Sequence, residues 1–87
     1  MYVIELALKF SPFPLSVERK ELNQAEALYH QIKHSLEKGH QGLIELTCDK
    51  IESKRICVVA NEILAVQIYE KTASSIGTKR PGFTFDT

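Results

Sequence analysis

The chain opens with a clean alternation of apolar and polar positions. Between residues 2 and 10, every second side chain is apolar, and Glu5 and Lys9 lie on the other side of the extended chain. A period of two is typical of a half-buried β-strand. Two prolines then interrupt the pattern, because proline lacks the N–H that a sheet ladder needs. Residues 15–20 follow, and we expect them to pair back on the first strand as a short edge strand.

A helical period replaces the alternation in the next segment. Apolar side chains form one stripe between residues 23 and 38, which comprises Ala25, Leu28, Tyr29, Ile32 and Leu36. Asn23 is the expected N-cap, and Glu26 lies three residues later, as in a capping box. Gly39 is expected to end the helix in the left-handed conformation, and Lys38 complements the negative end of the helix dipole. These signals predict one amphipathic helix.

Three further strands are predicted at residues 43–49, 55–60 and 63–69, which are rich in β-branched side chains. The links between them are short and polar, which favours antiparallel pairing of consecutive strands. The predicted fold class is therefore α+β, with a small, mostly antiparallel sheet. The element order is β-β-α-β-β-β, and the one helix covers one face of the sheet.

The register of the hairpin between residues 43 and 60 decides where its two cysteines lie. A two-residue turn at 52–53 would place Cys48 opposite Cys57. A three-residue turn at 51–53 would instead pair Cys48 with Ile56, and Leu46 with Val58. A slip of one residue moves every side chain to the other face. We expect the second register because it gathers the apolar side chains on one face, with the two cysteines on opposite faces and unable to bridge.

The predicted strands carry apolar side chains on both faces, and a single helix can cover only one face of a small sheet. The expected covered face consists of Ile4, Leu6, Leu8, Ile44, Leu46, Cys48, Ile56, Val58, Leu64, Val66 and Ile68. The opposite face carries Val3, Ala7, Leu43, Cys57, Val59, Ile63, Ala65 and Tyr69. Apolar patches above about 400 Å² are uncommon on soluble monomers. A second copy of the chain would cover such a face, although scattered exposed apolar side chains are also normal.

Composition narrows the function classes. The 87 residues suffice for one domain, expected at 1–71, and Lys plus Arg equals Asp plus Glu at 11 each. The formal net charge is zero, so the chain lacks the strong positive potential of a general nucleic-acid binder. The same neutrality does little to oppose self-association. No apolar run reaches the length of a membrane span, and neither a signal peptide nor a disulfide framework is evident. We therefore expect a soluble protein of the cytoplasm.

Catalytic or metal-binding chemistry has little support. His30 and His34 are four residues apart on the predicted helix, but spacing fixes no carboxylate or cysteine beside them. Cys48 and Cys57 read as ordinary strand residues, because no base or electropositive setting is indicated for a reactive thiol. The four glycines are isolated and form no phosphate-binding loop. We expect no catalytic residue, no metal and no cofactor, and a function that is not enzymatic.

The last segment, residues 72–87, is predicted to be either a flexible tail or an arm that docks elsewhere. The leading hypothesis is a homo-oligomer, a dimer in the first instance, or a complex with an unidentified protein. Its expected contact residues are Val59, Ala65 and Tyr69 on the uncovered face, with Arg80 and Phe83 on the arm. The alternative is a nucleic-acid-binding module, in which the basic and aromatic arm attracts phosphates and stacks on bases. The basic edge at Arg19 and Lys20 would contribute to the same binding.

Several stretches have a distinctive sequence, namely residues 1–10, 16–20, 46–50, 65–71 and the Arg-Pro-Gly-Phe motif at 80–83. In these stretches the chain resembles an uncharacterised family of small proteins from cyanobacteria and red-algal plastids. The resemblance implies a soluble protein of photosynthetic cells, in the cytoplasm or the plastid stroma. It implies no activity, because the family has no assigned function, ligand or catalytic residue, and therefore no functional residue is transferred.

Overall fold

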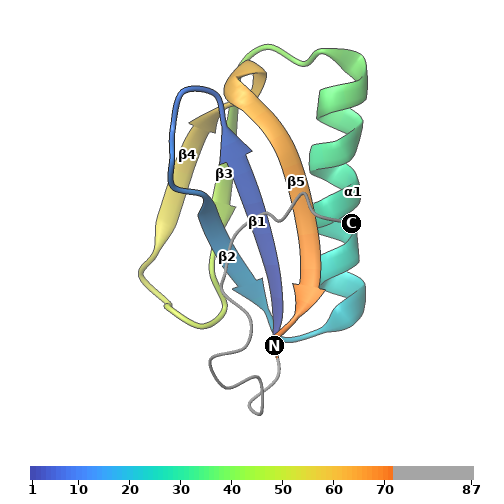
Figure 1. Cartoon of the computed structure of the whole chain (residues 1–87). Coiled ribbons are helices and arrows are strands. Elements are labelled where there is room, and N and C mark those ends of the chain that lie inside the picture. The colour runs from blue at the N-terminus through green and yellow to red at the C-terminus, as the bar shows by residue number, and fades with distance from the viewer. Residues whose placement is uncertain (72–87) are drawn as a thin grey trace.

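The computed structural model describes residues 1–71 and contains one helix and five strands (Figure 1). The elements are β1 (Tyr2–Leu8), β2 (Leu15–Arg19), α1 (Leu22–Lys38), β3 (Leu43–Thr47), β4 (Arg55–Val59) and β5 (Ile63–Glu70), with a short 3₁₀ turn at Ala60–Glu62. The α+β class and the predicted element order are confirmed. The predicted tail or arm at 72–87 lies outside the described residues.

The strands form two antiparallel sheets, of order β2-β1-β5 and β3-β4. β2 pairs back on β1 as predicted, from Tyr2 opposite Arg19 to Leu6 opposite Leu15. The prediction that β5 pairs with the strand before it is wrong, because β5 pairs with the other edge of β1. The 3₁₀ turn carries the chain across, and the backbone N–H of Lys9 donates to the carbonyl of Glu62 at 2.8 Å.

One face of the three-stranded sheet carries the core, and α1 and the β3–β4 hairpin cover it together (Figure 1). The buried apolar side chains are Ile4, Leu6, Val17, Ala25, Leu28, Ile32, Ile44, Leu46, Cys48, Val58, Ala60 and Ile63. They form a single cluster, so the hairpin shares with the helix the task of excluding water from β1 and β2.

The helix ends as predicted but begins elsewhere. Gly39 adopts the left-handed conformation with φ 66°, and the next N–H, of His40, donates to the carbonyl of Ser35 at 2.9 Å. At the other end, Glu21 is the N-cap, with an extended backbone and no capping hydrogen bond from its side chain. The prediction of Asn23 as the cap is therefore wrong, because Asn23 lies inside the first helical turn.

The register of β5 corrects one core assignment. The pairing with β1 shifts between Ala7 and Leu8, so that Leu8 lies opposite Ile63 and Leu64 is the extra residue of a bulge. Ile63 is consequently 4% exposed and Leu64 65% exposed, the reverse of the prediction. β1 also ends two residues early, and Phe10 lies in a loop instead of on the core face.

The hairpin has the predicted faces but not the predicted partners. Leu46 pairs with Ile56 and Ile44 with Val58, an offset of two residues that leaves each side chain on its expected face. The offset arises because Cys48 and Asp49 leave the ladder and bond to β2. The N–H of Asp49 donates to the carbonyl of Glu18 at 2.9 Å. As predicted, Cys48 is buried, Cys57 is exposed, and both are free thiols.

Within residues 1–71, no helix combines the length and the apolar character that crossing a bilayer requires.

Candidate functional site

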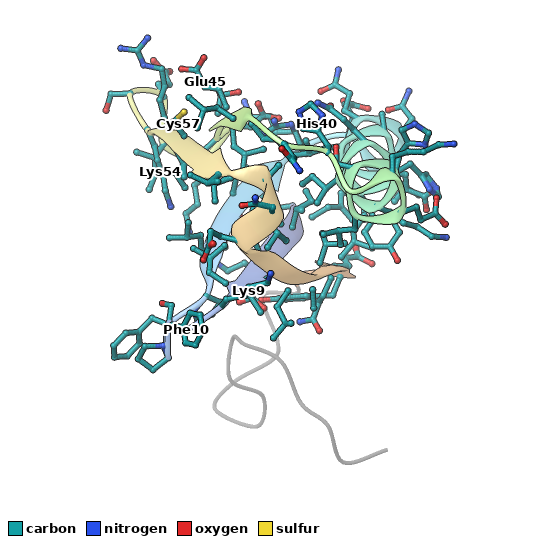
Figure 2. All side chains as sticks on the ribbon, turned by 90° about the horizontal axis from the view of Figure 1, so that it is seen from above. Lys9, Phe10, His40, Glu45, Lys54 and Cys57 are labelled. Carbon is teal, nitrogen blue, oxygen red and sulfur yellow. The ribbon has the colours of Figure 1, made fainter. Side chains whose placement is uncertain are left out.

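The outer face of the β3–β4 hairpin is the clearest candidate for a partner surface. We call it the hairpin surface, and it consists of Leu43, Glu45, Thr47, Arg55, Cys57 and Val59, all of which are exposed. Glu45 and Cys57 lie opposite each other on it (Figure 2). At one end, Leu43 lies opposite Val59, and they are 66% and 45% exposed. Two aliphatic side chains therefore lie opposite each other in solvent, outside the core.

One edge of this hairpin is open. In the part of the chain that the structure describes, β4 pairs with β3 alone. The N–H of Ala60 donates to the carbonyl of Gly42 at 2.8 Å, which fixes the alternation of backbone groups along β4. Even-numbered residues therefore turn their N–H toward β3, and those of Arg55, Cys57 and Val59 turn toward the open edge. An unpaired strand edge is a template for another strand.

The predicted contact residues do not gather on one sheet. Val59 lies on the hairpin surface, but Ala65 and Tyr69 belong to β5 in the other sheet, where both are half-buried. The neighbouring side chains Val3 and Glu5 are buried, at 5% and 1% exposure, so the expectation of one open apolar face is wrong there. Arg80 and Phe83, on the arm that the nucleic-acid alternative needs, lie outside the described residues. Of the two basic residues that the same alternative adds, Arg19 is half-buried and Lys20 is exposed.

The half-buried Tyr69 lies beside a buried carboxylate. Glu5 accepts a hydrogen bond from Nε2 of Gln67 at 3.0 Å and a longer one from the Tyr69 hydroxyl at 3.5 Å. Burial raises the pKa of Tyr69, and the negative charge of Glu5 raises it further. The phenol therefore stays protonated and serves as a donor inside the protein.

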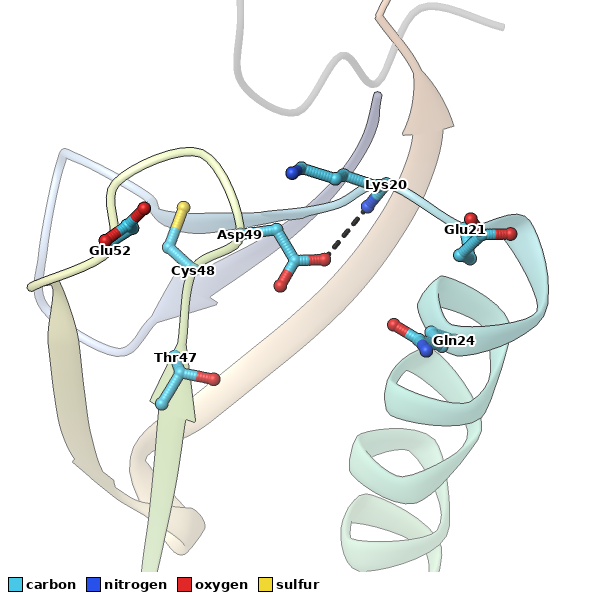
Figure 3. A pocket seen from close by; sticks show the side chains of 7 residues that line it. All are labelled: Lys20, Glu21, Gln24, Thr47, Cys48, Asp49 and Glu52. Atoms are coloured by element: carbon cyan, nitrogen blue, oxygen red, sulfur yellow. Dashed lines mark hydrogen bonds between the residues drawn. The ribbon is translucent and has the colours of Figure 1, made fainter.

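An open pocket of about 460 Å³ lies where the end of β3 approaches the start of α1 (Figure 3). Its lining residues are Lys20, Glu21, Gln24, Thr47, Cys48, Asp49 and Glu52. The carboxylate of Asp49 accepts the backbone N–H of Lys20 at 3.0 Å, which ties the loop after β3 to the residue before the helix (Figure 3).

Cys48 is the chemically distinctive residue of this pocket. Its Sγ accepts the backbone N–H of Glu18 at 3.3 Å. Burial opposes ionisation, but the N–H groups of Ile51, Glu18 and Lys50 and the charge of Lys54 outweigh it, so the pKa of Cys48 is lowered. The alternating pattern around Cys48 does not indicate this setting. The nearby lysines at 50 and 54 were the available signal, whereas the backbone donors come from the fold.

A catalytic or metal-binding assembly is not apparent among the described residues. No histidine lines the pocket, so the Cys48 thiol has no imidazole base there. His30 and His34 are exposed on α1, and no group of three potential metal ligands was found in residues 1–71.

Comparison with known proteins relates the chain to one family. The model of the UPF0367 protein family matches residues 3–71. A UPF0367 protein of Synechococcus sp. strain WH7803 is 62% identical over 86 residues, which cover 99% of each chain. A UPF0367 protein of Prochlorococcus marinus strain MIT 9303 is 59% identical over 87 residues, with both chains fully covered. No solved structure matches the chain.

Proposed function

We propose that this chain, which belongs to the UPF0367 protein family, is a non-enzymatic interaction module that forms a homodimer through its β3–β4 hairpin. The family has no assigned function, so the proposal rests on the geometry of the described residues. The observation that carries it is the open edge of β4, which bears the exposed Val59.

The backbone of β4 suits pairing with a second copy of itself. Antiparallel pairing about a two-fold axis at Cys57 brings Arg55 of one subunit opposite Val59 of the partner subunit. The outward N–H groups of the two strands then find carbonyl partners, and the two-fold makes the contact close as a dimer. A four-stranded sheet results, and the hairpin surfaces of both subunits become one continuous face.

The charges of the chain are compatible with this contact. The formal net charge is zero, so two copies approach without mutual repulsion. Arg55 is the one charged side chain of β4, and it lies beside an aliphatic residue across the two-fold, where its methylene stem can pack. Val59 lies at the β4 contact and supplies apolar area that is removed from water.

Two further elements of the proposal concern activity and location. A non-enzymatic role is supported by the Cys48 pocket, where the thiol lies without a histidine among the described lining residues. A cytoplasmic location is supported by two free cysteines in one small domain, a state that reducing compartments maintain.

Cross-linking at Cys57 tests the proposed contact. The Cys48→Ser variant keeps Cys57 as the single thiol, and a short bismaleimide should join two copies of it into a covalent dimer. The matched Cys57→Ser variant retains only the buried Cys48 and should stay monomeric on a denaturing gel. Circular dichroism verifies that both variants fold. A failure of the folded Cys48→Ser variant to cross-link at high protein concentration would contradict pairing about Cys57.

A further inference from the structure

The loop between β1 and β2 presents two aromatic rings to solvent. Phe10 is 101% exposed and Phe13 76% exposed, the highest values among the large hydrophobic residues of the described chain. Figure 2 shows Phe10 on a projection that leaves the body of the protein on the side away from α1. Single exposed apolar side chains are common, but two phenylalanines at one tip form a concentrated apolar feature that the fold itself does not use.

The backbone holds this tip in an unusual conformation. Phe10 has φ 62°, in the left-handed region that bulky side chains rarely adopt. On one side, the N–H of Lys9 bonds to the carbonyl of Glu62, and on the other the N–H of Ser11 bonds to the carbonyl of Leu8 at 3.3 Å. Two prolines restrict the residues that follow. Strain of this kind persists only where the surroundings enforce it, and it concentrates at functional positions.

The same tip has few backbone N–H groups left to desolvate. Pro12 and Pro14 have no N–H, and the N–H of Ser11 is already bonded to Leu8. The Ser11 hydroxyl donates to the carbonyl of Phe13 at 3.1 Å. Removing the loop from water therefore costs less than for an ordinary loop, whose free N–H groups would lose their hydrogen bonds.

We propose that the β1–β2 loop, residues 9–14, attaches the protein to a lipid surface by inserting Phe10 and Phe13 into the interface. Lys9 is the only charged residue of this loop, and it is exposed. Its long side chain can reach the headgroups while the rings lie deeper. The loop contains no acidic residue that an anionic headgroup would repel.

A lipid interface fits the shape of the loop better than a folded protein does. The tip projects from the body of the protein, and the pocket described above lies instead near the start of α1. A fluid interface accepts a protruding ring without a complementary pocket. Two rings and one lysine give a weak and reversible attachment, in the range of a single acyl chain, and not a stable anchor.

A tryptophan reporter tests the proposal directly, because the natural sequence has no tryptophan. In the Phe13→Trp variant of the full chain, the emission should shift to shorter wavelength on addition of vesicles. We expect the shift with phosphatidylcholine alone and a stronger response with an equimolar mixture of phosphatidylcholine and phosphatidylglycerol. The matched Leu22→Trp variant, at the exposed first residue of α1, should show no shift.

Co-sedimentation with the same vesicles measures the contribution of the rings. The double variant Phe10→Ala/Phe13→Ala should lose about tenfold or more in partitioning. Lys9→Gln should remove the preference for the anionic vesicles and keep the basal binding. Both phenylalanines are exposed, so the double variant should keep the circular dichroism of the natural chain.

Two results would overturn the lipid proposal. One is a natural chain that binds neither vesicle, and the other is a double variant that binds as well as the natural chain. If the double variant instead loses self-association in light scattering while the natural chain ignores vesicles, the loop belongs to a contact between proteins and the lipid proposal is wrong.

Discussion

Leu43 lies directly opposite Val59 across the β3–β4 ladder, and both aliphatic side chains face water. Each is the last residue of its strand at that end of the hairpin, and the core-facing neighbours Ile44 and Val58 are also paired with each other. The hairpin therefore buries one apolar row and exposes the beginning of another. The core-facing row stabilises the fold, whereas the exposed row is available to a partner.

Replacement of Val59 by threonine should weaken association without weakening the fold. Val59 is 45% exposed, so the unfolding free energy of the subunit should change by no more than about 0.5 kcal/mol. The dissociation constant of the dimer should rise, because apolar area is lost from the contact. Urea denaturation at low concentration and sedimentation equilibrium measure the two quantities separately. A large loss of subunit stability with unchanged association would contradict the assignment.

The bulge in β5 predicts opposite outcomes for two adjacent residues. Ile63→Ala should lower the unfolding free energy by about 2–5 kcal/mol, because Ile63 is buried in the core cluster. Leu64→Ala should cost no more than about 0.5 kcal/mol, since Leu64 is exposed. Urea denaturation of both variants provides the comparison. Equal costs would show that the register shift is absent.

Gly39→Ala should destabilise the protein by about 1 kcal/mol through backbone strain. Gly39 has φ 66°, and an added Cβ would meet nothing within 4 Å, so no steric clash contributes. Gly39→Asn should cost less, because asparagine tolerates the left-handed conformation better. Thermal unfolding ranks the three proteins. An alanine variant as stable as the natural chain would mean that the helix does not end at this residue.

The Cys48 thiol should ionise below its ordinary pKa of 9.0 in the folded protein. The Cys57→Ser variant isolates it, and thiolate absorbance near the ultraviolet edge follows its titration. In urea the midpoint should return toward the ordinary value. A folded midpoint at or above that value would contradict the role of the backbone donors.

The same shift has a consequence for stability. Since the folded pKa of Cys48 lies below the unfolded one, the thiolate favours the folded state. The resulting gain is complete above the unfolded pKa and is lost as the pH falls through the folded pKa. In the window between the two values, the unfolding free energy of the natural chain should therefore rise with pH relative to Cys48→Ser.

Local patterns in the sequence predict most of the elements but not how they assemble. The alternation before the prolines and the stripe from Ala25 to Leu36 identify β1 and α1, because both depend on near neighbours. The pairing of β5 with β1 joins residues at opposite ends of the domain, and short links alone pointed to the wrong strand. The bulge at Leu64 arises from that pairing, so the sequence could not anticipate it.

Of the candidate sites, the sequence predicts the features that depend on local alternation and not those that depend on the fold. Alternation along the hairpin correctly places Cys48 on the inner face and Cys57 and Val59 on the outer face, since a shift of two residues in register preserves the faces. The polar surroundings of Cys48 come from β2 and from the loop after β3, which only the fold brings together. Glu5 was expected among solvent-facing positions, whereas the structure buries it beside Gln67.

Light scattering across a range of concentrations is the most direct test of the proposed assembly. We predict a dimer for the natural chain and a monomer for Val59→Lys, because the lysine would lie directly opposite Arg55 of the partner subunit, where like charges repel. Leu22→Lys, at an exposed position outside the hairpin, should remain a dimer. A natural chain that stays monomeric at every concentration, or a Val59→Lys variant that still dimerises, would contradict self-association through the hairpin.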